Sequence, residues 1–80
     1  MPCYHRFFWY AENEAHVAAH GITREEFEEV VLAATLEDVT PSKTSDRSTV
    51  TGYTSAGRWI TCVYEEIDEI TCHPITAFDA

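Results

Sequence analysis

The sequence predicts a single α+β domain over residues 1–80, with an N-terminal strand and a helix pair packed on a mainly antiparallel, twisted sheet of three to four strands. Eighty residues are too few for two hydrophobic cores. Apolar residues make up 45% of the chain and aromatic residues 12%, as in globular domains rather than disordered segments. Helical apolar spacing fills the first half, whereas β-branched alternating segments fill the second.

The N-terminal third predicts a short aromatic strand over residues 5–9, followed by a helix from Ala11 to His20. Small apolar residues recur at helical spacing: Ala11, Ala15, Ala18 and Ile22. They predict a narrow apolar stripe that lets this helix approach its neighbour closely. Gly21 is the expected C-terminal stop, because glycine adopts a left-handed conformation without steric cost.

The second predicted helix has the clearest local signals. Thr23 and Glu26 form a capping box, and Ile22 and Phe27 are spaced as a hydrophobic staple. The expected buried face repeats at i, i+3, i+4 and i+7: Phe27, Val30, Val31 and Ala34. The glutamates between residues 25 and 29 are expected to form a solvated face at the positive end of the helix dipole, with a docking surface for a basic partner as the alternative.

A polar connector is expected over residues 40–46, which contain Pro41, with a short extra strand near residues 37–39 as an addition. Residues 48–54 then predict a strand, and Ser55–Gly57 a hairpin turn. Both faces of residues 58–64 are fairly apolar, which predicts a central strand covered on both sides. Residues 65–68 predict a turn.

A last strand is predicted over residues 69–78. Pro74 lies near its middle and lacks the N–H that a sheet ladder needs. We therefore expect an edge position, a bulge or a break there.

The charge balance limits the partners. Five basic residues against 14 acidic ones give a formal charge of −9, which repels nucleic acid at long range. An RNA-binding role therefore requires a local basic patch, whereas a basic protein partner fits the overall charge. The chain has no apolar run of 18 residues and no long apolar segment at its start, so we expect no membrane span and a cytoplasmic location.

Cysteine and histidine give weak signals. An odd count of three cysteines disfavours a disulfide scaffold, and Cys62 and Cys72 are expected to be free, buried and apolar in behaviour. His16 and His20 stand at i and i+4 on the predicted helix, a spacing that can hold a metal ion. No third ligand is identifiable from the sequence, so the favoured expectation is no metal and no cofactor.

The scarce basic residues mark the candidate site. Arg47 and Arg58 flank the predicted hairpin, either at its opposite ends or across its edge, and Tyr53 and His73 belong to the same sheet. Arginine binds phosphate, and tyrosine and histidine can transfer protons, so these four residues are candidates for RNA cleavage. The alternative is that Arg47 and Arg58 are solvated charges paired with Asp46 or Glu65.

The whole pattern resembles the BrnT family of type II toxins, in the RelE/ParE-like superfamily. The resemblance is carried by six segments: Phe8-Trp9 with Glu12-Asn13-Glu14, His16–Ile22, Thr23–Phe27, Asp46–Tyr53, Gly57–Tyr64 and Ile75–Ala77. It covers most of the chain from Phe8 to Ala77. Three positions depart from the family pattern: Ala19 replaces a lysine, and His73 and Phe78 replace arginines.

The resemblance implies a compact toxin fold, metal-independent RNA cleavage that arrests translation, and neutralisation by a cognate antitoxin. Arg47 and Arg58 match family positions, whereas phenylalanine cannot replace the phosphate contacts of an arginine, so weakened activity is expected. His73 can titrate near neutral pH and is a reasonable proton-transfer group. The competing hypothesis is a non-catalytic, acidic protein-binding module that keeps the fold, and a third is a small metal-binding domain.

Overall fold

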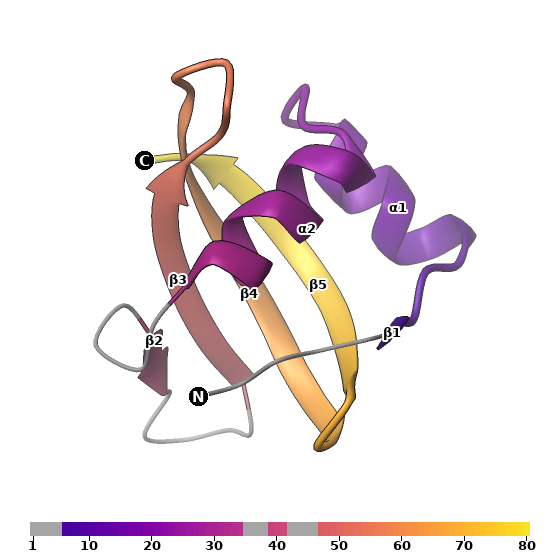
Figure 1. The fold of residues 1–80 in the computed structure, drawn as a ribbon. Helices are drawn as coiled ribbons and strands as arrows, with labels where there is room; N and C mark the ends of the chain where they lie inside the picture. Colours follow the sequence, from indigo (N-terminus) through magenta and orange to yellow (C-terminus); the bar gives the residue numbers. More distant parts are fainter. Residues whose placement is uncertain (1–5, 35–38, 42–46) are drawn as a thin grey trace.

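Figure 1 shows the computed structural model of the chain, which describes residues 6–34, 39–41 and 47–80. Its elements are β1 (Arg6–Phe7), α1 (Ala11–Ala18), α2 (Arg24–Ala33), β2 (Val39–Pro41), β3 (Arg47–Tyr53), β4 (Trp59–Asp68) and β5 (Thr71–Asp79). The strands form one sheet in the order β1-β5-β4-β3-β2, in which only β1 and β5 pair in parallel. Helix α2 crosses one face of this sheet, and α1 lies along β5 (Figure 1). The predicted α+β class is confirmed.

One face of the sheet carries the core. The side chains of Ile60, Cys62 and Tyr64 alternate along β4 toward the helices and are fully buried. Trp59, by contrast, is exposed on the opposite face, and its neighbours there are half-buried. The expectation of a strand covered on both sides is therefore wrong, because α2 covers only one face of β3 and β4, and α1 lies along β5. We call the side of β3, β4 and β5 opposite α2 the open face.

Helix α2 follows its sequence prediction closely. The Thr23 hydroxyl accepts a hydrogen bond from the Glu26 amide at 3.1 Å, and a Glu26 carboxylate oxygen accepts from the Thr23 amide at 3.0 Å. Ile22, before the cap, and Phe27 are both buried, as the staple predicted. The whole predicted face is in the core: Phe27, Val30, Val31 and Ala34. Local signals were sufficient here because cap and apolar spacing agree.

Helix α1 differs from its prediction. The alanines at positions 11, 15 and 18 are exposed, and the buried residues of the helix are Asn13 and Val17. The helix ends at Ala18 rather than His20, and Gly21 follows with φ of 72°, as a left-handed stop requires. Alanine side chains bury little apolar area, so their spacing did not decide which face met the sheet.

The hairpin between β3 and β4 is confirmed, and a further short strand, β2, pairs with β3. The Thr54 amide donates to the Arg58 carbonyl at 2.8 Å, and Gly57 takes a φ of 84°. Thr40 and Pro41, expected in the connector, instead lie in β2 and pair with Thr49 and Ser48. Residues 37, 38 and 42–46, which hold the rest of that prediction, lie outside the described residues. The sheet has five strands because β1 and β2 join it as short edges.

The second hairpin is shifted from its prediction. Strand β4 continues through the expected turn at residues 65–68, and the chain reverses at Glu69 and Ile70 instead. Pro74 pairs with Tyr64, and the next pair joins Thr76 to Val63, so Ile75 is an extra residue in β5. Of the three outcomes expected for Pro74, the structure shows the bulge.

Candidate functional site

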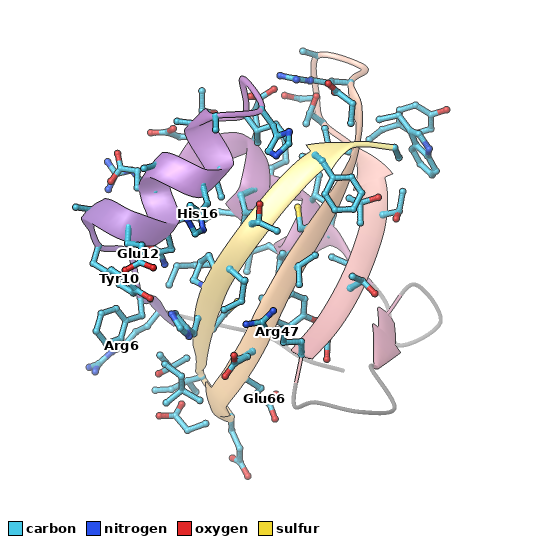
Figure 2. The ribbon with its side chains drawn as sticks, turned by 180° about the vertical axis from the view of Figure 1, so that it is seen from behind. Arg6, Tyr10, Glu12, His16, Arg47 and Glu66 are labelled. Atoms are coloured by element: carbon cyan, nitrogen blue, oxygen red, sulfur yellow. The ribbon has the colours of Figure 1, made fainter. Side chains whose placement is uncertain are left out.

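Three strands bring a cation, an anion and an imidazole into one row. In the sheet register, Glu65 of β4 lies between Arg47 of β3 and His73 of β5. Their side chains share the open face, because paired residues in a sheet point to the same side. The Arg47 Nε lies 3.5 Å from a Glu65 carboxylate oxygen, and 53% of the Arg47 side chain remains exposed. Viewed from behind, Figure 2 shows Arg47 in front of the strands.

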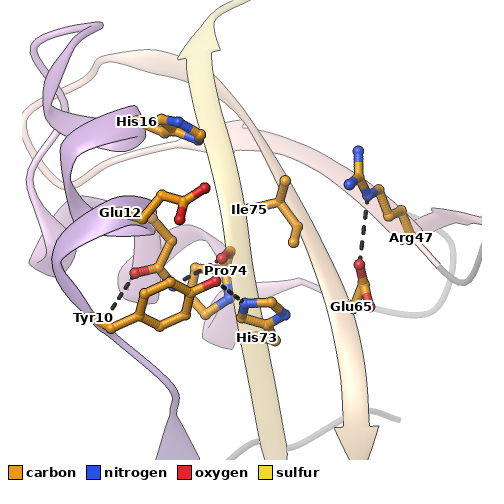
Figure 3. Close-up of a pocket in the computed structure, with 9 residues that line it drawn as sticks. Tyr10, Glu12, His16, Arg47, Glu65, His73, Pro74 and Ile75 are labelled. Carbon is orange, nitrogen blue, oxygen red and sulfur yellow. Dashed lines mark hydrogen bonds and ion pairs between the residues drawn. The ribbon is translucent and has the colours of Figure 1, made fainter.

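Helix α1 closes one side of this row to form a pocket of about 200 Å³. The helix contributes Glu12 and His16, and the β5 bulge contributes Pro74 and Ile75 to its wall. Figure 3 shows these helix side chains on one side of β5, with Arg47 and Glu65 on the other and His73 on β5 itself. The pocket therefore gathers two carboxylates, two imidazoles, a phenol and a guanidinium within one small volume.

Tyr10 holds the imidazole of His73. The Tyr10 hydroxyl and the His73 Nε2 are 2.8 Å apart, and the two rings stack with centroids 5.5 Å apart at 27°. Phe8 packs against both rings, with centroids 5.4 Å from Tyr10 and 6.0 Å from His73. These contacts fix the position and ring plane of His73, which is what a proton-transfer group needs.

Asn13 anchors α1 beside the site. It is 2% exposed, and its amide nitrogen donates to the carbonyls of Phe8 at 2.8 Å and Pro74 at 2.9 Å. Its side-chain oxygen accepts from the Tyr10 amide at 2.8 Å. One buried side chain thus joins the start of α1, the segment that follows β1 and the β5 bulge. No sequence signal marks Asn13 for this role, because a polar residue in a helix is usually exposed.

Arg58 lies elsewhere and is held by the protein. Its Nε and Nη2 donate to the two carboxylate oxygens of Asp79 at 2.8 and 3.1 Å, and Nη1 lies 3.8 Å from Glu26. The guanidinium also donates to the carbonyls of Gly21 and His20. The hydrogen bond to Asp79 raises the pKa of Arg58 and lowers that of Asp79. Arg58 therefore ties the α1–α2 connection to the last strand.

The structure separates the four predicted site residues into two groups. Arg47 and His73 line the pocket, whereas Arg58 and Tyr53 lie at the other end of the β3–β4 hairpin. Tyr53 lies six positions beyond Arg47 along β3, which corresponds to roughly 20 Å. The sequence left open whether the two arginines lie at opposite ends or across an edge, and the structure shows opposite ends. The expected pairing of Arg47 with Glu65 is confirmed, whereas Arg58 pairs with Asp79.

The histidine pair does not form the helical arrangement that the metal hypothesis assumed. His16 is in α1 and lines the pocket, but His20 lies beyond the helix end and packs edge-on against Phe78 at 6.4 Å. Within the described ranges, no three histidine, cysteine or acidic side chains gather as metal ligands. Cys62 and Cys72 are free and buried as predicted, and burial raises the pKa of Cys62 to about 12.

Several α2 glutamates have intramolecular partners. Glu28 accepts from the Trp9 indole at 2.7 Å, and Glu29 accepts from the Ser55 amide at 2.7 Å. Glu26 serves both the cap and Arg58. The expected role at the helix start is confirmed for Glu26, whereas Glu28 and Glu29 are half-buried with partners rather than part of a solvated face. Neither helix in the described ranges is long and apolar enough to cross a membrane.

The pocket residues missed by sequence reasoning come mostly from α1. Tyr10 stands at the helix start, and Glu12 and His16 follow at i, i+4 spacing, which puts the last two on one flank. His16 has the same i, i+4 spacing to His20, and the metal hypothesis considered that pair rather than Glu12 and His16. From the sequence, Glu65 is expected only as a charge that neutralises Arg47. Chemically, the set can bind an anion at Arg47 and move protons through carboxylate, imidazole and phenol groups.

Comparison with known proteins supports the fold. No protein-family profile matches the sequence, and no curated protein sequence matches it. Among solved structures, the crystal structure of the Brucella abortus ribonuclease toxin BrnT superposes with a TM-score of 0.70 at 20% sequence identity. The match covers 94% of this chain and 95% of that toxin chain. The resemblance expected from the sequence is thus confirmed as a shared fold, and the chain folds as BrnT does.

Proposed function

We propose that this chain is a metal-independent ribonuclease of the BrnT toxin type and that the pocket beside Arg47 and His73 cleaves RNA. The observation that carries the proposal is the placement of these two residues with Glu12 and Tyr10 around one pocket, on the fold of a ribonuclease toxin. A cation for the phosphate, a base and an acid are the groups that RNA cleavage needs. Of the two arginines expected at the site, Arg47 supplies the cation.

The proposed reaction uses the nucleophile of the RNA itself. The Glu12 carboxylate accepts the proton of a ribose 2′-hydroxyl, whose oxygen attacks the adjacent phosphorus. The bond to the 5′-oxygen breaks as the His73 imidazolium donates a proton to that oxygen, leaving a 2′,3′-cyclic phosphate and a 5′-hydroxyl. Arg47 binds the non-bridging oxygens, where negative charge grows in the transition state. Tyr10 is the positioning residue, because its hydroxyl orients His73.

The modest cation supply predicts weak phosphate binding. Arg58 is engaged with Asp79, and Lys43 lies outside the described residues. The ion pair with Glu65 also partly neutralises the charge of Arg47. We therefore infer a slow enzyme whose RNA binding depends only weakly on salt, since the salt dependence grows with the number of phosphates that the protein neutralises.

Neutralisation by a cognate antitoxin is part of the same proposal. An acidic chain of −9 favours a partner with a basic contact surface. The competing hypothesis of a non-catalytic, acidic binding module draws its support from this charge, from the acidic start of α2 and from the aromatic residues near the N-terminus. The partners of Glu26, Glu28 and Glu29 within the chain leave that module with less free acidic surface on α2 than the sequence indicated.

A cleavage assay in chelator tests the proposal. Purified protein is incubated with single-stranded RNA in EDTA, and the products are analysed for cyclic phosphate ends. We expect cleavage by the wild type and a loss of at least about 100-fold in Arg47→Ala and His73→Ala. Arg24→Ala is the matched control, because Arg24 is an exposed arginine paired with Glu14 away from the pocket. Intact RNA, or equal losses in the control, would overturn the proposal.

A further inference from the structure

An aromatic pair stands at the far end of the open face. Tyr53 of β3 and Trp59 of β4 are cross-strand partners next to the first hairpin turn, with ring centroids 4.3 Å apart. They are 66% and 43% exposed, respectively. Neither ring contributes to the buried core. Their register puts them on the same face as Arg47 and His73.

The surface between the pocket and this pair is lined by hydroxyl groups. Four threonines face it from three strands: Thr49, Thr51, Thr61 and Thr76. The hydroxyls of Thr51 and Thr61 lie 2.9 Å apart across the β3–β4 pair, which confirms that both point to this side. Val63 and Phe78 are apolar residues on the same side.

Charge is distributed unevenly over the molecule. The open face runs from Arg47 to Tyr53 in β3, from Trp59 to Glu65 in β4 and from His73 to Phe78 in β5. Of the described residues whose register puts them on this face, the charged ones are Arg47 and Glu65. Their formal charges cancel, although the chain as a whole carries −9. A phosphodiester chain therefore meets less repulsion along this face than the net charge suggests.

We propose that Tyr53 and Trp59 form a stacking platform for a base of single-stranded RNA that lies along the open face and enters the pocket at Arg47. The inference rests on the proposed ribonuclease function and specifies its substrate as an unpaired RNA of minimum length. Exposed aromatic rings on a sheet bind unpaired bases by stacking, with little sequence preference. The hydroxyls between them can donate to phosphate and ribose oxygens.

The separation of the two features sets the length. The six residue steps from Arg47 to Tyr53 span roughly 20 Å. A strand with stacked bases advances about 3.4 Å per nucleotide, so about six nucleotides cover the distance. A dinucleotide reaches the pocket but not the platform, whereas an RNA of about ten nucleotides reaches both.

Cleavage of these two substrates tests the inference. We expect a lower KM for the longer RNA in the wild type. Trp59→Ala and Tyr53→Ala should each raise the KM for the longer RNA by about 5- to 100-fold and leave dinucleotide cleavage unchanged. Trp59→Phe should keep the KM for the longer RNA close to the wild-type value, since phenylalanine retains a stacking ring. Leu32→Ala is the matched control, because Leu32 is exposed at 47% on α2.

A binding measurement separates this inference from the proposed function. A 2′-O-methyl oligonucleotide of the longer length lacks the nucleophile, and its binding to the wild type and to Trp59→Ala is followed by the fluorescence anisotropy of a dye attached to the oligonucleotide. Cleavage of both RNAs with no dependence on Trp59 or Tyr53 overturns the platform and leaves the ribonuclease standing. Binding of the analogue that depends on Trp59, without any RNA cleavage, retains the platform and overturns the ribonuclease. Absence of both binding and cleavage overturns both.

Discussion

The two ends of the sheet each carry an arginine, and the two arginines have different surroundings. At one end, Arg47 projects on the open face beside His73 with about half of its side chain in solvent. At the other end, Arg58 points to the helix side, where it contacts Asp79, Glu26 and the backbone carbonyls that precede α2. The same residue type lines a pocket and is half exposed in one region, whereas in the other it is held by several partners within the fold.

This contrast follows from the face of the sheet on which each arginine lies and from the carboxylate that it contacts. Side chains alternate between the two faces along a strand, and Arg47 of β3 lies on the open face, opposite Glu65. Arg58 precedes Ile60 by two residues and therefore shares its helix-facing side. A sequence motif records that an arginine is present but not which side of a strand it faces. The carboxylates that receive each guanidinium then determine its role. We call the end at Arg47 the site end and the end at Arg58 the clamp end, and substitutions at each end test this division.

The largest expected effect is on catalysis at the site end. Arg47→Ala should lower kcat by roughly 100- to 1,000-fold, about 3–4 kcal/mol of transition-state stabilisation, with little change in the unfolding midpoint. Arg58→Ala should do the reverse: it should lower the unfolding midpoint and leave kcat within a few-fold below that midpoint. RNA cleavage and thermal denaturation of both variants measure the two effects. Equal kinetic losses in both variants would show that Arg58 also serves the site.

The next effect concerns the support of the site. Asn13→Ala leaves the carbonyls of Phe8 and Pro74 and the Tyr10 amide without their side-chain partner. We expect a loss of about 2–3 kcal/mol in the free energy of unfolding, measured by urea denaturation, because unsatisfied buried groups keep their desolvation cost.

A matched exchange sharpens this prediction. Asn13→Asp keeps the acceptor for the Tyr10 amide but loses the donor to both carbonyls. We expect an equal or larger destabilisation, since it also buries a charge. Glu14→Gln, an exposed change on the same helix, should be nearly neutral. A stable Asn13→Ala variant would show that α1 is held mainly by Val17.

The fold was predictable where local signals suffice. The cap at Thr23, the apolar spacing from Phe27 to Ala34 and the Gly57 turn are short-range features, and each was confirmed. The face of α1 that meets the sheet was not predictable in this way. Its alanines set the apolar spacing but bury little area, whereas the buried residues are Asn13 and Val17. Its contact with β5 depends on Asn13, whose partner carbonyl at Pro74 lies 61 residues away.

The candidate site was predictable in part for the same reason. Arg47 and His73 stood out by residue type, but their common pocket depends on β4 lying between their strands. Tyr10 enters through a hydrogen bond to a residue 63 positions away, which no spacing in the sequence records. Tyr53 was grouped with them because it shares β3, although the length of that strand separates it from the pocket.

A smaller effect is expected from the cap near the clamp end. Thr23→Ala removes the acceptor for the Glu26 amide and should cost about 1 kcal/mol of unfolding free energy. Glu26 also pairs with Arg58, so the loss should be smaller in an Arg58→Ala background if the two contacts depend on each other. A double-mutant cycle by urea denaturation measures this coupling, and strict additivity would show that cap and clamp are independent.

The smallest effect compares one aspartate from each end of the sheet as pH falls. A hydrogen bond from Arg58 lowers the pKa of Asp79, and one from the Ile70 amide lowers the pKa of Asp68. A carboxylate with a lowered folded pKa stabilises the fold above its unfolded pKa, near 4, and that stabilisation is lost as pH falls through the folded pKa. Asp79→Asn and Asp68→Asn should therefore each weaken the acid dependence of the unfolding midpoint between about pH 2 and pH 6.

Salt distinguishes the two aspartates. The Asp79 carboxylate faces the guanidinium of Arg58, and salt screens exposed ion pairs. The main partner of the Asp68 carboxylate is the uncharged Ile70 amide at 2.9 Å, and the charge of Arg6 lowers its pKa less than this hydrogen bond does. Raising the salt concentration to about 1 M should therefore reduce the stabilising contribution of Asp79 more than that of Asp68. If both contributions respond equally to salt, the clamp end is held by the hydrogen-bond geometry of Arg58 rather than by its charge.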